Sequence, residues 1–124
     1  MAITFLRLQE YLDKIAQKAN LDANNSLHGL FWQTTFEKFA AGDVPNKRCG
    51  GAPVPIIDKI DPTKSAFYQI LQQGWCAMPQ MPKTGPFVSD SNYSITLADG
   101  TVVTGQQILS DIHAWLAAGS PENG

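Results

Sequence analysis

The sequence predicts a mostly α-helical single domain spanning residues 1–124, with long loops and a small β-hairpin near residues 94–104. Three observations favour this class. Apolar residues recur at helical spacing near both ends of the chain, and segments rich in Pro and Gly separate the helical stretches. Around Asp99-Gly100, apolar residues alternate with polar ones, which is typical of a tight hairpin turn.

The first predicted helix runs from about residue 5 to residue 20, with Thr4 as its N-cap. Its opposite face carries charged and amide side chains, so the helix is amphipathic and one face is suited to burial. The apolar residues of that face are Phe5, Leu8, Leu12, Ile15, Ala16 and Ala19.

A polar turn and two short helical segments are predicted next, before residue 43. The first segment covers residues 27–31. The second begins at Thr34, which fits a capping box with Glu37, and ends at Gly42.

Residues 43–60 are predicted to form a long loop, because Pro and Gly recur throughout the segment. Asp61 followed by Pro62 then marks a helix start, and Gly74 marks its end. A second irregular loop follows, over residues 75–86.

The last predicted helix covers residues 105–118 and begins at a capping box, Thr104 to Gln107. The terminal helices are expected to cross, with Leu8, Leu12, Ile112 and Trp115 at the contact. Beyond that helix, we expect residues 119–124 to form a disordered tail.

The composition excludes several classes of partner. A formal net charge of −2 offers no long-range attraction to nucleic acid, and no apolar run approaches the length of a membrane span. No secretory signal pattern is visible at the start, so we expect a cytoplasmic protein, or a periplasmic one if a signal peptide has been removed. In the cytoplasm we expect no disulfide between Cys49 and Cys76, because reducing conditions keep such pairs open.

Several short motifs between Asp61 and Pro121 resemble the second half of a class I cytochrome c domain. They are Asp-Pro-x-x-Ser-Ala-Phe-Tyr-x-x-Leu at 61–71, the Met78-Pro79 and Met81-Pro82 steps, and the terminal helix from Gln107 through Trp115 to Gly119 and Pro121. The resemblance implies a cytochrome c-like fold, with a Met as axial haem ligand. The chain has no Cys-x-x-Cys-His motif, so it implies no covalent haem.

Two cofactor hypotheses follow as alternatives to a cofactor-free protein. The resemblance implies that His28, with Met78 or Met81, could ligate a non-covalent haem. Cys76, Met78 and Met81 put three sulfur donors within six residues, and soft ligands of this kind select Cu(I). The competing interpretation is that these side chains are packing residues, since Met fills irregular gaps.

No nucleophile and base stand out as a pair, so enzyme activity has no positive support in the sequence. We expect instead a non-catalytic accessory or interaction protein, which partners a redox enzyme or a second copy of itself. Its loops carry more apolar side chains than one small core needs, and these predict an interface. The candidate interface residues are Val54, Ile56, Trp75, Met78 and Phe87.

Overall fold

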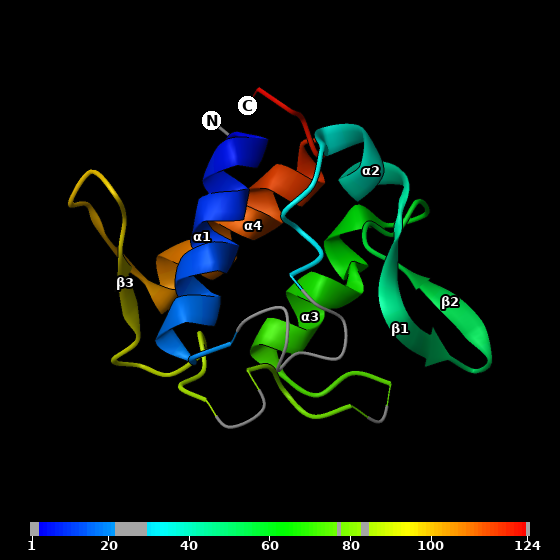
Figure 1. Ribbon diagram of the computed structural model, residues 1–124, viewed down its shortest axis with the longest axis horizontal. Coiled ribbons are helices and arrows are strands. Elements are labelled where there is room, and N and C mark those ends of the chain that lie inside the picture. The colour runs from blue at the N-terminus through cyan, green and yellow to red at the C-terminus, as the bar shows by residue number, and fades with distance from the viewer. Residues whose placement is uncertain (1–2, 22–29, 77, 83–84, 124) are drawn as a thin grey trace.

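The structure, a computed structural model, describes residues 3–21, 30–76, 78–82 and 85–123. These residues form a mixed α/β arrangement, with two antiparallel hairpins lying to either side of a group of helices (Figure 1). The elements are α1 (Phe5–Lys18), α2 (Phe36–Ala41), β1 (Asp43–Cys49), β2 (Ala52–Pro55), the 3-10 turn η1 (Pro62–Lys64), α3 (Ala66–Gln72), β3 (Ser94–Thr96), β4 (Val102–Thr104) and α4 (Gly105–Ala117). The helices and the second hairpin were expected, whereas the first hairpin makes the class less helical than predicted.

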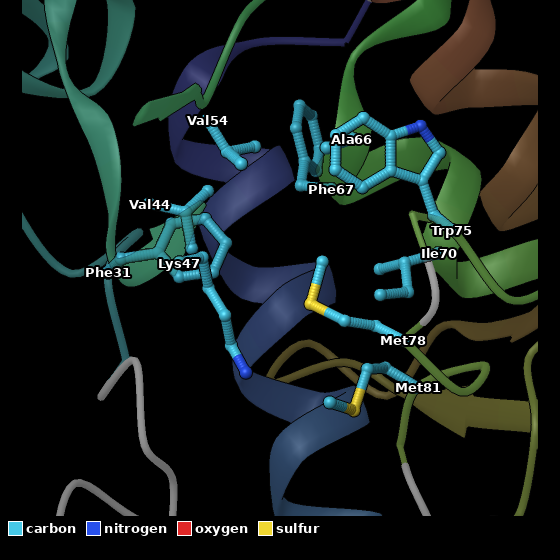
Figure 2. A pocket seen from close by; sticks show the side chains of 10 residues that line it. All are labelled: Phe31, Val44, Lys47, Val54, Ala66, Phe67, Ile70, Trp75, Met78 and Met81. Atoms are coloured by element: carbon cyan, nitrogen blue, oxygen red, sulfur yellow. The ribbon is translucent and has the colours of Figure 1, made fainter. Parts of the chain in front are cut away.

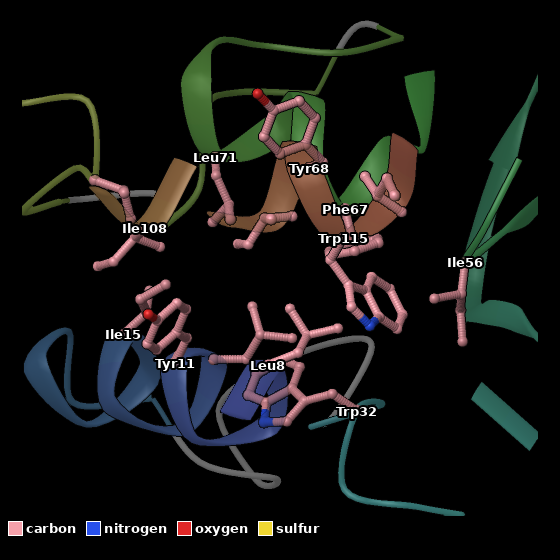
Figure 3. Close-up of a cluster of buried hydrophobic side chains, with 14 of the residues drawn as sticks. Leu8, Tyr11, Ile15, Trp32, Ile56, Phe67, Tyr68, Leu71, Ile108 and Trp115 are labelled. Atoms are coloured by element: carbon pink, nitrogen blue, oxygen red, sulfur yellow. The ribbon is translucent and has the colours of Figure 1, made fainter. Parts of the chain in front are cut away.

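Helices α1 and α4 cross each other, as predicted (Figures 1 and 3). The predicted contact residues are all buried, and Leu8, Ile112 and Trp115 have no exposed surface at all. The Tyr11 hydroxyl donates a 2.6 Å hydrogen bond to the Asp111 carboxylate, which joins the two helices at their polar edge. Apolar burial on one face of each helix is therefore the main source of this contact.

Residues 119–122 pack against the helix crossing, although they were expected to form part of a disordered tail. The Trp115 indole N–H donates to the Pro121 carbonyl at 2.7 Å, and the Phe5 N–H donates to the Glu122 carbonyl at 2.9 Å. Ser120 is buried. The prediction was wrong because Gly119 and Pro121 were interpreted as the end of ordered structure, although Gly119 at φ 92° turns the chain back onto the core.

The β3–β4 hairpin confirms the prediction made from Asp99-Gly100. Ser94 pairs with Thr104, and Thr96 pairs with Val102. Gly100 has φ 90°, the conformation for which glycine is suited at such a turn. The hairpin leads directly into α4, whose N-cap Thr104 accepts from the Gln107 N–H at 3.2 Å.

The β1–β2 hairpin corrects the prediction of a loop over residues 43–60. The two strands pair antiparallel from Cys49 and Ala52 back to Asp43 and Pro55, with an irregular register between. Gly50 and Gly51 form the turn, at φ 60° and 83°. Proline was taken as evidence against strands, but a two-stranded ribbon consists of edge strands, where proline is tolerated.

Two helix starts also differ from the predicted ones. The N-cap of α2 is Thr35, which accepts from the Lys38 N–H at 3.3 Å, so the capping box from Thr34 does not form. The helix expected from Asp61 is divided into η1 and α3. The division falls at Ser65, whose hydroxyl donates to the Pro62 carbonyl at 2.6 Å and so competes with continuous helix.

The short helix predicted over residues 27–31 lies mostly outside the described residues. Among the helices that the structure describes, none is long and apolar enough to cross a membrane.

Candidate functional site

A small apolar pocket of about 40 Å³ lies between the β1–β2 hairpin, α3 and the loop after α3 (Figure 2). We call it the methionine pocket, because both methionines of that loop line it. Its residues are Phe31, Val44, Lys47, Val54, Ala66, Phe67, Ile70, Trp75, Met78 and Met81. Figure 2 shows the hairpin residues on one side and Ile70, Trp75 and Met78 on the other, with the Met78 sulfur directed into the space between them.

The residues around the pocket differ in how deeply they are buried. Val54 and Phe67 are buried in the main core and form its floor. Phe31, Ile70, Trp75, Met78 and Met81 are half-buried, so they contact both the core and the solvent. An apolar lining that is only half-covered is the arrangement expected of a binding pocket.

Hydrogen bonds to backbone carbonyls hold in place the loop after α3, which carries Met78 and Met81. Trp75 and Met78 exchange both of their N–H and C=O groups at 2.9 Å, which closes a tight turn. The Met81 N–H donates to the Ile70 carbonyl at 2.9 Å, and the side-chain amide of Gln80 donates through Nε2 to the Leu71 carbonyl at 3.0 Å. The main chain therefore fixes where the two Met side chains begin, and an unbranched Met side chain has several rotatable bonds beyond that point.

A disulfide between Cys49 and Cys76 joins the hairpin to this loop, with the two Cα atoms 6.0 Å apart. The expectation that these cysteines stay unpaired is wrong in the structure. It rested on the compartment, whereas the pairing follows from the unpredicted hairpin. Because β1 ends at Cys49, the hairpin brings this residue beside the turn that carries Cys76, which links two walls of the pocket.

Lys47 is the one charged residue among those described as lining the pocket. It forms no ion pair with any described residue. Its neighbour Arg48 is directed elsewhere, since the guanidinium donates to the Gly51 carbonyl at 3.0 Å. Among the residues that the structure describes, the pocket therefore combines an apolar lining with one positive charge that has no acidic partner.

The predicted interface residues separate into two groups. Val54 and Ile56 are 2% and 3% exposed, so they belong to the core of the isolated chain and offer no surface to a partner. Trp75, Met78 and Phe87 are half-buried, and the first two line the pocket. Sequence reasoning missed Lys47 and Val44 as site residues. The available signal was Gly50-Gly51, which marks a hairpin turn and would have placed both on one strand.

The Cu(I) hypothesis loses a ligand in this structure, because Cys76 is in a disulfide and has no thiolate to offer. Met78 and Met81 both line the pocket, but the Lys47 ammonium beside them opposes a second cation. Among the described residues, no group of three His, Cys, Asp or Glu side chains is placed to hold a metal ion.

A haem does not fit the methionine pocket as the structure describes it. The pocket measures about 40 Å³ and a second apolar cavity beside it about 70 Å³, whereas ligand sites usually measure roughly 300–1,000 Å³. Met81, Phe31, Phe67 and Ile70 line both cavities, so packed side chains occupy the space between them. The proposed axial ligand His28 lies outside the described residues.

The shifted pKa values belong to groups with structural explanations. Burial, followed by the hydrogen bond to Asp111, raises the pKa of Tyr11. The N–H groups of Asp61 and Ile60 donate to Asp58 and lower the pKa of its carboxyl. Burial raises the pKa of Tyr93 to about 12. None of these groups lines the methionine pocket.

Comparisons with protein-family models, with curated proteins and with solved structures found no match to this chain. The resemblance to class I cytochrome c domains therefore stays a prediction.

Proposed function

We propose that this chain is a non-catalytic accessory protein, which binds a partner protein through the methionine pocket. The observation that carries the proposal is the half-covered apolar lining around Trp75, Met78 and Met81, held beside the core by backbone hydrogen bonds and a disulfide. Indole and thioether side chains are enriched at the centres of protein interfaces.

The construction of the site supports binding over a purely packing role. The loop is tied at Cys76 by the disulfide and at Met81 by its hydrogen bond to the Ile70 carbonyl, so fewer backbone conformations are lost when a partner binds, which reduces the entropy cost of association. The methionines keep flexible side chains on that fixed backbone. Such tips adapt to a partner's surface while the frame stays rigid.

The cytochrome c-like fold and a redox enzyme as partner are the finer parts of this proposal. They rest on the motifs between Asp61 and Pro121 and on the crossing of the terminal helices. The disulfide supports an oxidising compartment in place of the expected cytoplasm, since such bonds persist there.

Selection of a random peptide library on the immobilised, oxidised protein tests the proposed function without assuming a ligand. We expect enriched peptides that share a sequence pattern and shift the methyl NMR signals of Met78 and Met81. Binding should fall when Trp75→Ala or Met78→Ala replaces wild type.

Val102→Ala is the matched control, because Val102 is 63% exposed and lies on the hairpin at the other side of the molecule (Figure 1). It removes an apolar surface side chain without touching the pocket. The proposal fails if the selected peptides bind the two pocket variants as well as they bind Val102→Ala.

A further inference from the structure

We infer that the methionine pocket takes one branched aliphatic side chain of a partner protein, with an acidic residue beside it in the partner's sequence. This inference deepens the proposed function and rests on it. It is drawn from the size of the pocket, from its lining and from the charge of Lys47.

The size of the pocket decides the anchor. A cavity of about 40 Å³ is far below the roughly 150 Å³ that admits a benzene ring, and one water occupies roughly 30 Å³ of liquid. The space therefore suits the end of a leucine, isoleucine or valine side chain. A larger ring would enter only if Met78 or Met81 moved aside.

The lining decides the polarity of the anchor. Apart from Lys47, the described residues that line the cavity are all apolar. A polar group placed among them would lose its hydrogen bonds to water without gaining others from these side chains. An aliphatic side chain has no hydrogen bonds to water to lose, and burying its apolar surface in the pocket favours binding.

The charge of Lys47 indicates which residue of the partner lies next to the aliphatic side chain that enters the pocket. Its side chain lines the pocket from β1, and Figure 2 shows the ammonium directed away from Trp75, toward one margin of the site. Within the described part of the chain it is unpaired, and no carboxylate lines the pocket with it. A carboxylate of the partner, close in sequence to the aliphatic anchor, would complement this charge.

The test uses the oxidised full chain and short fluorescent peptides in a Gly/Ser background. One peptide carries a leucine next to two glutamates, a second replaces the glutamates with lysines, and a third replaces the leucine with serine. Fluorescence anisotropy at low salt measures their affinities. We expect the leucine–glutamate peptide to bind best.

Charge exchange gives the decisive comparison. Lys47→Glu should weaken binding of the leucine–glutamate peptide about fivefold, the size expected of a surface ion pair, and should strengthen binding of the leucine–lysine peptide by a similar factor. Lys14→Glu is the matched control, since Lys14 lies on α1 beside β3 and makes the same change in net charge. It should leave the order of the peptides unchanged.

The inference is overturned by no binding of the leucine–glutamate peptide, by equal binding of the two charged peptides to wild type, or by equal effects of Lys47→Glu and Lys14→Glu. Binding of the serine peptide as tight as that of the leucine peptide overturns the aliphatic anchor. The proposed function is tested separately, because the peptide library has no charge bias. If the selected peptides lose affinity for Met78→Ala but bind Lys47→Glu as well as wild type, the proposed function is upheld and this inference is wrong.

Discussion

The helix crossing and the methionine pocket are stabilised in different ways. At the crossing of α1 and α4, Leu8, Ile108 and Trp115 are completely buried, and close packing does most of the work (Figure 3). At the pocket, Trp75, Met78 and Met81 are half-buried, and the disulfide and main-chain hydrogen bonds hold the loop that carries them. A loop that is held through its backbone can present its side chains to a partner. The side chains of a packed core are already buried and cannot bind one.

The largest expected effect breaks the crossing itself. Trp115→Ala removes a fully buried indole and its hydrogen bond to the Pro121 carbonyl. We expect a loss of about 3–5 kcal/mol in the free energy of unfolding, measured by urea denaturation. Val102→Ala, on the exposed hairpin, should cost less than about 0.5 kcal/mol. A similar loss in both variants would show that the crossing is not the main packed contact.

The next effect tests whether the pocket depends on its covalent link. Replacing both Cys49 and Cys76 with serine removes a bridge that spans 27 residues of sequence. The lost constraint on the unfolded chain predicts a destabilisation of about 3–4 kcal/mol in urea denaturation. Wild type unfolded with a reductant present should show the same loss.

The region in which the double-serine variant loses stability distinguishes the pocket from the helix crossing. In the folded double-serine variant, hydrogen exchange should quicken at Trp75 and Met78, while the amides of α4 keep their relative protection. Equal quickening in both regions would mean that the disulfide supports the whole core, and the contrast between the two regions would fail.

The dependence of stability on alkaline pH tests the burial of Tyr93 in the core. Its hydroxyl is buried without a hydrogen-bond partner among the described residues, and burial raises its pKa from 10.0 to about 12. The stability that the protonated Tyr93 hydroxyl contributes is fully present below pH 10 and is lost as the pH rises toward 12. The reason is that Tyr93 releases its proton at a lower pH in the unfolded chain than in the folded protein. The loss should be on the order of 2 kcal/mol. Tyr93→Phe should flatten the fall in stability with pH, measured by urea denaturation across this range.

The sequence predicted the packed side better than the pocket side, and the reason is physical. Helical periodicity and local caps such as Thr4 and Thr104 act within a few residues, so they are visible in the sequence alone. The contact between Leu8 and Trp115 followed because each helix has one apolar face to bury.

The pocket side depends on contacts between distant segments. The irregular pairing of β1 with β2 hides the alternation by which strands are recognised, and proline strengthens the impression of a loop. Once the hairpin was missed, the approach of Cys49 to Cys76 was also missed, together with the position of Lys47. Met78 and Trp75 were still identified, because apolar residues in a polar loop stand out without knowledge of the pairing.

The smallest expected change in stability carries the most information about function. Met78→Ala removes a half-exposed side chain from the pocket, so it should cost about 1 kcal/mol or less in urea denaturation. Ile112→Ala removes a similar apolar volume from the helix crossing and should cost about 2–5 kcal/mol, because the cavity it leaves is fully enclosed.

Peptide binding should follow the reverse order. At a temperature where both variants are folded, Met78→Ala should lose affinity for the selected peptides, and Ile112→Ala should keep it, because Ile112 does not line the pocket. Circular dichroism confirms the folded fraction before each titration. If Met78→Ala binds the peptides normally and costs as much stability as Ile112→Ala, Met78 is a packing residue. The pocket and the helix crossing would then differ in exposure but not in function.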